Sequence, residues 1–131
     1  IPSKGLVMDN GSGLSRSERV TPMQMASALK VAWFGRHAAE LQMSLPVAGV
    51  DGTLRNRIKD SPATGWARLK TGTLRNVVAL AGYVTDNVGW PWAVVVIVNH
   101  DNAKVARPVL DALVDSIARQ GPPAAGVARP R

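Results

Sequence analysis

The stretch that decides the fold is Arg68-Leu69-Lys70-Thr71-Gly72-Thr73-Leu74, followed by an apolar run from residue 77 to residue 84. Residues 66–73, 77–85 and 92–99 have the apolar, β-branched composition of strands. Because only short links separate them, we expect the strands to pair in order as an antiparallel meander. The Lys-Thr-Gly triplet then lies on a strand of this sheet, where its charged side chain needs a partner.

Helices are expected on either side of these strands in the sequence. Thr21, Pro22 and Gln24 have the spacing of an N-cap, a first-turn proline and a capping box, and Gly35 is a plausible stop. Residues 106–117 carry an apolar stripe at helical spacing, which predicts a helix that packs on the sheet. The predicted fold class is therefore α+β, with an antiparallel sheet of three C-terminal strands and flanking helices.

The composition fits one domain or a piece of one, because the chain has 131 residues and 46% of them are hydrophobic. We expect residues 1–119 to belong to this domain. The Pro-, Gly- and Ala-rich residues 120–131 are expected to form a flexible tail. The net charge of +7 fits either a solvated basic surface or an anionic partner such as nucleic acid, acidic lipid or a carboxylate-bearing polymer.

Several kinds of site are not expected. The chain has no cysteine, which excludes disulfides and thiolate metal sites, and His37 has no partner at metal-ligand spacing. We therefore expect no metal and no cofactor. The longest apolar run, residues 90–98, contains Pro91 and is far shorter than the roughly 20 residues of a spanning helix, so no transmembrane segment is expected.

One segment matches the Ser-x-x-K pattern of a serine nucleophile and its lysine: Ser27-Ala28-Leu29-Lys30. A helical wheel places Ser27 and Lys30 on the side opposite an apolar stripe, which consists of Met25, Ala28, Leu29, Ala32 and Trp33. A nucleophile and its base must be sheltered in a cleft. We therefore expect Ser27 and Lys30 to be solvent-exposed and not catalytic.

Five landmarks in order resemble one protein family, over about residues 6 to 119. They are residues 9–16 (DNGSGLSR), 20–22 (VTP), 44–54 (SLPVAGVDGTL), 70–74 (KTGTL) and 79–83 (ALAGY). The family is that of the low-molecular-mass class C penicillin-binding proteins, peptidase family S13. Its members are D-alanyl-D-alanine carboxypeptidases and endopeptidases of bacterial cell-wall maintenance. The resemblance implies a serine β-lactamase/penicillin-binding-protein transpeptidase-like fold.

The resemblance also implies roles for the central strand. Lys70 would be catalytic, attracting the substrate's terminal carboxylate and polarising the proton-transfer network. Thr71 and Thr73 would offer hydroxyls to the same carboxylate, and the Thr73 backbone N–H would be one oxyanion donor. Gly72 would let the substrate lie close to the strand.

A second part of the implied site binds the substrate's side chain. Arg16 would lie near that pocket and pair with a carboxylate, although an exposed loop charge is an equal alternative. Leu74 would border the pocket. The implied partners are peptidoglycan stem peptides and β-lactams, and the implied location is the periplasm or cell envelope.

The chain departs from the family in its nucleophile. No Ser-x-Asn occurs anywhere, and the only Ser-x-x-K is the one beginning at Ser27. The first residues include no initiator Met and no signal peptide, as if the chain began in mid-domain. We therefore expect the C-terminal part of a D,D-peptidase, which partners the missing N-terminal part of the same domain and is inactive alone.

Two other functions remain as alternatives. A small basic nucleic-acid-binding module would use the +7 charge and the cluster of Arg55, Arg57 and Lys59. The basic residues are scattered, however, and Tyr83 and Phe34 are the only Tyr and Phe, so no aromatic face for bases is expected. A purely structural or assembly role would follow if the sheet exposed an apolar edge, which would make the isolated chain self-associate.

Overall fold

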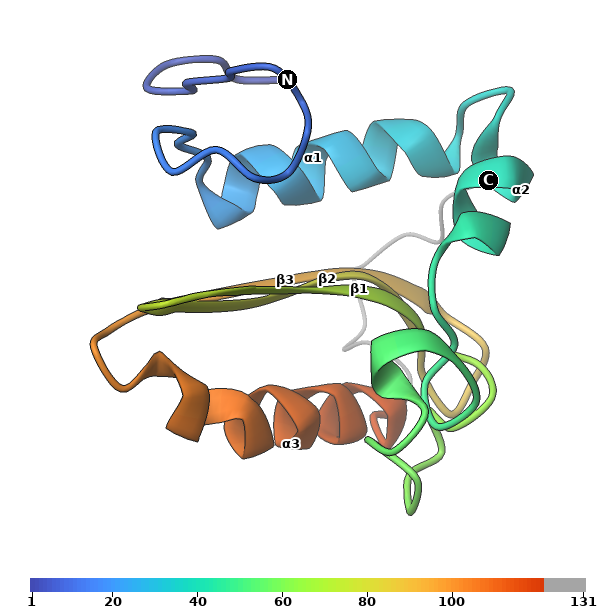
Figure 1. The fold of residues 1–131 in the computed structure, drawn as a ribbon. Helices are drawn as coiled ribbons and strands as arrows, with labels where there is room; N and C mark the ends of the chain where they lie inside the picture. The colour runs from blue at the N-terminus through green and yellow to red at the C-terminus, as the bar shows by residue number, and fades with distance from the viewer. Residues whose placement is uncertain (122–131) are drawn as a thin grey trace.

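The computed structural model describes residues 1–121 and has a three-stranded antiparallel sheet at its centre, with the strand order β1-β2-β3. The strands are β1 (Arg68–Leu74), β2 (Val77–Thr85) and β3 (Pro91–Asn99). Helix α1 (Pro22–Trp33) covers one face and α3 (Arg107–Ala118) covers the other (Figure 1). The expected α+β meander is confirmed. The expected tail lies, from residue 122 onward, outside the described residues.

Shorter elements complete the chain: α2 (Ala38–Ser44), the 3-10 helix η1 (Gly52–Leu54) and the 3-10 helix η2 (Ala103–Ala106). The predicted start of α1 is confirmed in detail. The Thr21 hydroxyl accepts from the Gln24 amide at 3.1 Å, and the Thr21 amide donates to Gln24 Oε1 at 2.9 Å. No helix within residues 1–121 combines the length and the apolar character needed to cross a bilayer.

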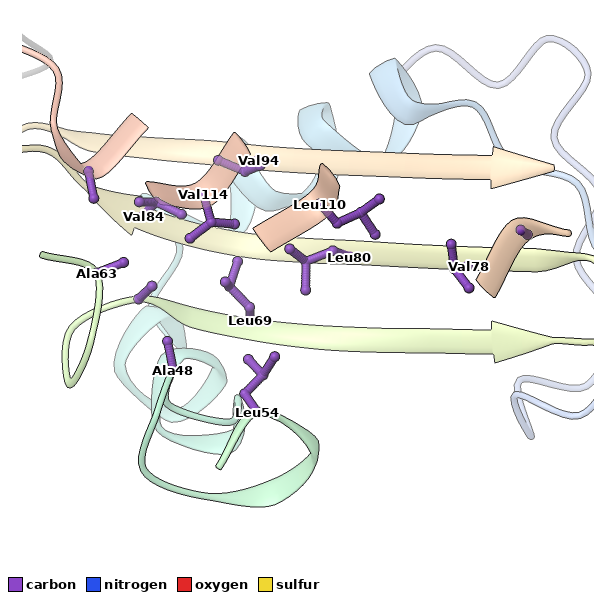
Figure 2. Packing of buried hydrophobic residues seen from close by; sticks show 13 residues of the cluster. Ala48, Leu54, Ala63, Leu69, Val78, Leu80, Val84, Val94, Leu110 and Val114 are labelled. Atoms are coloured by element: carbon purple, nitrogen blue, oxygen red, sulfur yellow. The ribbon is translucent and has the colours of Figure 1, made fainter. Parts of the chain in front are cut away.

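The main core lies between the sheet and α3 (Figure 2). Leu69 and Leu80 point to this side from β1 and β2, and Leu110 points back from α3; each is at most 2% exposed. Burying a side chain of this size stabilises the fold by about 1.5–3 kcal/mol. Side chains alternate between the two faces of a strand, so Arg68 and Lys70, the neighbours of Leu69 along β1, point to the face that α1 covers.

Gly82 makes the close pairing of β1 and β2 possible. Its φ is +150°, and a Cβ there would lie 2.1 Å from the Arg68 carbonyl oxygen and 2.9 Å from the Leu69 Cα. No side chain fits at these distances. The register that pairs Leu69 with Gly82 thus depends on glycine at this position.

Candidate functional site

Strand β1 is an edge strand whose outer side is only partly covered. The Leu69 amide donates to the Pro46 carbonyl at 2.9 Å, and the Ala48 amide donates to the Ala67 carbonyl at 2.9 Å. Within residues 1–121 no strand pairs with the outer side of residues 70–74. Backbone groups alternate between the two sides of a paired strand. Because the Leu69 amide points outward, the amides of Thr71 and Thr73 point to the same open edge.

Lys70 is exposed on the face of β1 opposite Leu69. Its Nζ donates to the Thr71 carbonyl oxygen at 2.7 Å, which brings the ammonium group to the open edge. No carboxylate in the described part of the chain lies within 4.0 Å of it. The charge of Lys70 is thus available to an anion that approaches this edge.

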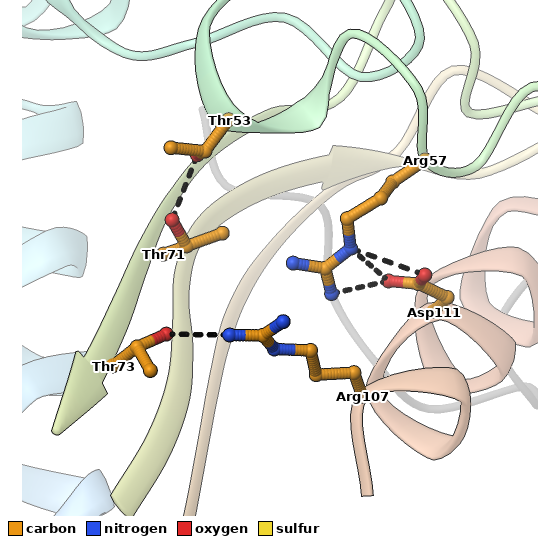
Figure 3. A network of polar contacts seen from close by, with 6 residues as sticks. All are labelled: Thr53, Arg57, Thr71, Thr73, Arg107 and Asp111. Carbon is orange, nitrogen blue, oxygen red and sulfur yellow. Dashed lines mark hydrogen bonds and ion pairs between the residues drawn. The ribbon is translucent and has the colours of Figure 1, made fainter. Parts of the chain in front are cut away.

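The hydroxyls of Thr71 and Thr73 lie on the other face of β1, toward α3 and η1 (Figure 3). Thr71 Oγ1 is 2.7 Å from Thr53 Oγ1, and Thr73 Oγ1 accepts from Arg107 Nη2 at 3.4 Å. The ammonium and the two hydroxyls therefore start from opposite faces of the strand. They can meet one ligand only at the open edge.

Gly72 and Leu74 share the Lys70 face. A Cβ at Gly72 would meet only the Ala79 Cβ, at 3.6 Å, which is an ordinary contact. The packing of this chain therefore does not require glycine at position 72, in contrast to Gly82. Leu74 is 43% exposed, so it offers apolar surface beside the open edge.

Arg16 is exposed in the loop closed by the bridge between Val7 and Arg19, whose two backbone hydrogen bonds are 2.9 Å long. This N-terminal segment lies on the α1 side of the sheet (Figure 1). No hydrogen bond or ion pair among residues 1–121 joins Arg16 to β1. The structure thus brings Lys70, Gly72 and Leu74 together but does not bring Arg16 to them.

Lys30 is exposed as expected, whereas the expectation that Ser27 faces solvent beside it is wrong. Both line a hollow of about 740 Å³ between α1 and the strands, together with aromatic side chains that include Trp33 and Tyr83. Ser27 is half-buried, whereas Ala28, assigned to the apolar stripe, is exposed. The helical wheel selected the wrong buried face because α1 is apolar on several sides: Met23, Ala26 and Val31 lie outside the stripe that it chose.

Tyr83 determines which side of α1 faces the sheet. Its ring lies 5.0 Å from that of Trp33, and its hydroxyl donates to the Leu29 carbonyl at 2.7 Å. Burial raises the pKa of Tyr83, which keeps the hydroxyl protonated as a donor. These contacts hold α1 over β3, which is two strand spacings, or about 10 Å, from Lys70 on β1. No hydrogen bond joins Ser27 to Lys30 in the described region.

No local sequence pattern indicates the polar network behind β1. Arg57 Nη2 lies 2.6 Å from Asp111 Oδ1, and Arg57 Nε lies 3.2 Å from both carboxylate oxygens, so η1's loop is tied to α3 (Figure 3). Arg57 belongs to the basic cluster on which the nucleic-acid alternative depends. Its pairing with Asp111 removes it from that cluster. Asp111 and Arg57 are 54 positions apart, and no local pattern joins them.

Comparisons with known proteins identify the family of the chain. Residues 1–120 match the D-Ala-D-Ala carboxypeptidase 3 (S13) family. The D-alanyl-D-alanine carboxypeptidase of Actinomadura sp. (strain R39) is 42% identical over 94 residues, which are 68% of this chain and 18% of the relative. The crystal structure of penicillin binding protein 4 (dacB) from Haemophilus influenzae has a TM-score of 0.75 and 28% identity, covering 88% of this chain and 28% of that one.

A second structure of the Haemophilus influenzae protein, complexed with a novel β-lactam, has a TM-score of 0.73 and 28% identity. It covers 86% of this chain and 29% of that one. The chain therefore spans less than a third of the length of these relatives. The family match, by contrast, covers nearly all of the chain. The chain belongs to the D-Ala-D-Ala carboxypeptidase 3 (S13) family.

Proposed function

We propose that residues 1–119 are the C-terminal part of a serine-type D-Ala-D-Ala carboxypeptidase or endopeptidase domain that acts on peptidoglycan peptides. Residues 70–74 are its substrate-binding strand. The observation that carries the proposal is the open edge of β1, where the Thr71 and Thr73 amides and the unpaired Lys70 ammonium converge. Family membership supports the same reaction class.

The edge has the groups that a peptide substrate needs. An extended peptide adds to an open strand edge through backbone hydrogen bonds, and the Thr71 and Thr73 amides are the donors for it. Lys70 attracts the substrate's carboxylate and favours the proton transfers beside it. The Thr73 amide is one oxyanion donor, and removing such a donor lowers turnover on the order of 10²–10³. A residue larger than glycine at position 72 would hold the substrate away from the strand.

The proposed pocket for the substrate's side chain involves Leu74 and Arg16. Leu74 borders it through its exposed surface. Arg16 pairs with a carboxylate of the substrate's side chain once its loop is positioned by the rest of the domain. Stem peptides and β-lactams are the partners in the periplasm or cell envelope, and the β-lactam complex of the Haemophilus influenzae relative supports this choice.

The nucleophile comes from a preceding part of the same domain. Within this sequence there is no Ser-x-Asn, and the one Ser-x-x-K lies on α1 beside β3. Lys70 lies on the same face of the sheet but on β1, two strands away from it. The chain can therefore bind and polarise a substrate, and it needs its N-terminal partner for the attack on the carbonyl carbon.

The test compares residues 1–131 with the full-length protein that carries them. We expect fluorescent penicillin labelling and D-alanine release only from the full-length protein. Lys70→Ala should lower its kcat/KM on the order of 10²–10³, since the charge acts at the reacting centre. Arg75→Ala removes an exposed charge beside the same strand and should change kcat/KM less than about threefold.

Two results would contradict the proposal. A penicilloyl adduct on residues 1–131 alone would show that the nucleophile is present, and loss of the adduct in Ser27→Ala would identify it. Equal kcat/KM values for Lys70→Ala and Arg75→Ala in the full-length protein would show that β1 is not the substrate strand.

A further inference from the structure

We propose that Arg107 is a second carboxylate-binding cation of the substrate strand, and that Arg57 keeps it available by occupying Asp111. The inference rests on the proposed function, because the ligand is the free C-terminal carboxylate of the peptide. It adds a specificity-determining residue from α3 to a site otherwise built from β1.

The hydrogen bond between Arg107 and Thr73 can run in only one direction. An arginine guanidinium donates hydrogen bonds and accepts none. In the contact of 3.4 Å between Arg107 Nη2 and Thr73 Oγ1, the threonine oxygen is therefore the acceptor. The Thr73 proton is left to donate elsewhere, and Thr73 is exposed at the open end of β1. A carboxylate oxygen at that edge is the acceptor that this arrangement lacks.

Arg107 has no acidic partner in the described part of the chain. It is exposed at the first residue of α3, and no carboxylate within residues 1–121 lies within 4.0 Å of it. Its contact with Thr73 is long for a hydrogen bond, so it is weak. A carboxylate that accepts from the guanidinium at the usual 2.7–2.9 Å would displace it at little cost.

Asp111 is the natural partner of Arg107. The two residues are four positions apart on α3, the spacing at which opposite charges pair along a helix. Asp111 instead pairs with Arg57 at 2.6 Å, and both side chains are well shielded, at 26% and 21% exposed. The short bidentate contact satisfies the carboxylate. Arg107 is therefore not paired with Asp111 and contacts Thr73 instead.

Figure 3 shows the result: Arg107 reaches β1 at Thr73, while Arg57 and Asp111 face each other one helical turn away. Lys70 approaches the same edge from the other face. A carboxylate at the edge therefore meets two cations and the Thr73 hydroxyl. A peptide whose C-terminus is a neutral amide cannot make the two charged contacts.

The test uses the full-length protein and two substrates, an acylated peptide ending in D-Ala-D-Ala and the same peptide with a C-terminal carboxamide. Arg107→Gln should raise KM for the carboxylate substrate about 10- to 100-fold, the range for a hydrogen bond to a charged group, and should leave kcat within about threefold. KM for the carboxamide should not change. Arg107→Lys should restore part of the affinity, because it keeps the charge and loses the fork.

Arg57→Gln tests whether Arg57 prevents Asp111 from pairing with Arg107. It leaves Asp111 unpaired and able to capture Arg107, so KM for the carboxylate substrate should rise. Adding Asp111→Asn removes the carboxylate that would pair with Arg107, so KM for the carboxylate substrate should return to the wild-type value. Arg75→Gln is the matched control for charge loss, and thermal melts of every variant verify folding.

The outcomes separate the two proposals. If the wild-type protein hydrolyses neither substrate, the proposed function is wrong and the role of Arg107 falls with it. If it hydrolyses D-Ala-D-Ala and Arg107→Gln matches Arg75→Gln on both substrates, only the role of Arg107 is refuted. The KM of the Arg57→Gln, Asp111→Asn double variant is the last check. If it is as high as the KM of Arg57→Gln alone, the proposed role of Arg57 in keeping Asp111 from pairing with Arg107 is refuted.

Discussion

Two glycines of the sheet should respond in opposite ways to the same substitution. At Gly82, an added Cβ would stand 2.1 Å from the Arg68 carbonyl oxygen, and the φ of +150° disfavours any side chain. Backbone strain of this kind costs about 1–3 kcal/mol. The clash with backbone atoms, which cannot rotate away, adds to it. We expect Gly82→Ala to lower the free energy of unfolding by about 3–5 kcal/mol, a large part of the ~5–15 kcal/mol of an ordinary domain.

At Gly72, the same Cβ meets only the Ala79 Cβ at 3.6 Å, and φ lies outside the left-handed region. Alanine there restricts the unfolded chain, which stabilises by about 0.4–1 kcal/mol. We expect Gly72→Ala to fold at least as well as wild type. In the full-length protein it should lower kcat/KM for D-Ala-D-Ala peptides by at least about tenfold, because a displacement of about 1 Å in a reactive complex can cost far more.

Urea unfolding followed by circular dichroism measures the first effect. With a slope of about 1–3 kcal/mol per molar urea, Gly82→Ala should move the midpoint down by about 2 M, and Gly72→Ala should leave it within about 0.5 M. A Gly82→Ala midpoint within 0.5 M of wild type would refute the pairing of β1 against β2. Full activity in Gly72→Ala would refute the close approach of substrate to β1.

Two further changes test other parts of the structure. Tyr83→Phe removes the bond to the Leu29 carbonyl and should lower the free energy of unfolding by about 1 kcal/mol in thermal melts, while α1 remains docked through Trp33. Asp115→Asn tests a pH effect. The hydrogen bond from Arg119 holds the pKa of Asp115 below its ordinary value, so the ionised form stabilises the fold. The contribution is present above the unfolded pKa of about 3.9 and is lost as pH falls through the folded value. Asp115→Asn should therefore be less stable than wild type at pH 7, and the difference should disappear in melts at acidic pH; a gap that persists unchanged at low pH would contradict this origin.

Local sequence signals predicted much of the fold. The capping box at Thr21 and Gln24 needs only three neighbouring residues, and the structure contains it. The meander followed from short links between apolar strands, since a short link leaves antiparallel pairing as the simplest geometry. The ion pair of Asp115 and Arg119, at 2.8 Å, likewise joins residues only four positions apart on one helix.

The failure at α1 shows where such signals stop. Apolar residues occur on several sides of this helix, so its wheel admits more than one buried face. The contacts of Tyr83 with Trp33 and Leu29 select among them, and Tyr83 is 54 positions from Leu29. Ser27 is turned toward the hollow as a consequence.

The sequence by itself thus determined the strand that carries Lys70, Thr71, Gly72 and Thr73, because strand propensity and the order of motifs are properties of neighbouring residues. Only the tertiary structure decided what surrounds that strand. The open edge depends on the partial cover by residues 46–48, and the cation at Thr73 depends on the pairing of Arg57 with Asp111 across 54 positions. Contacts between distant segments form only when the chain folds around the sheet, and no local pattern encodes them.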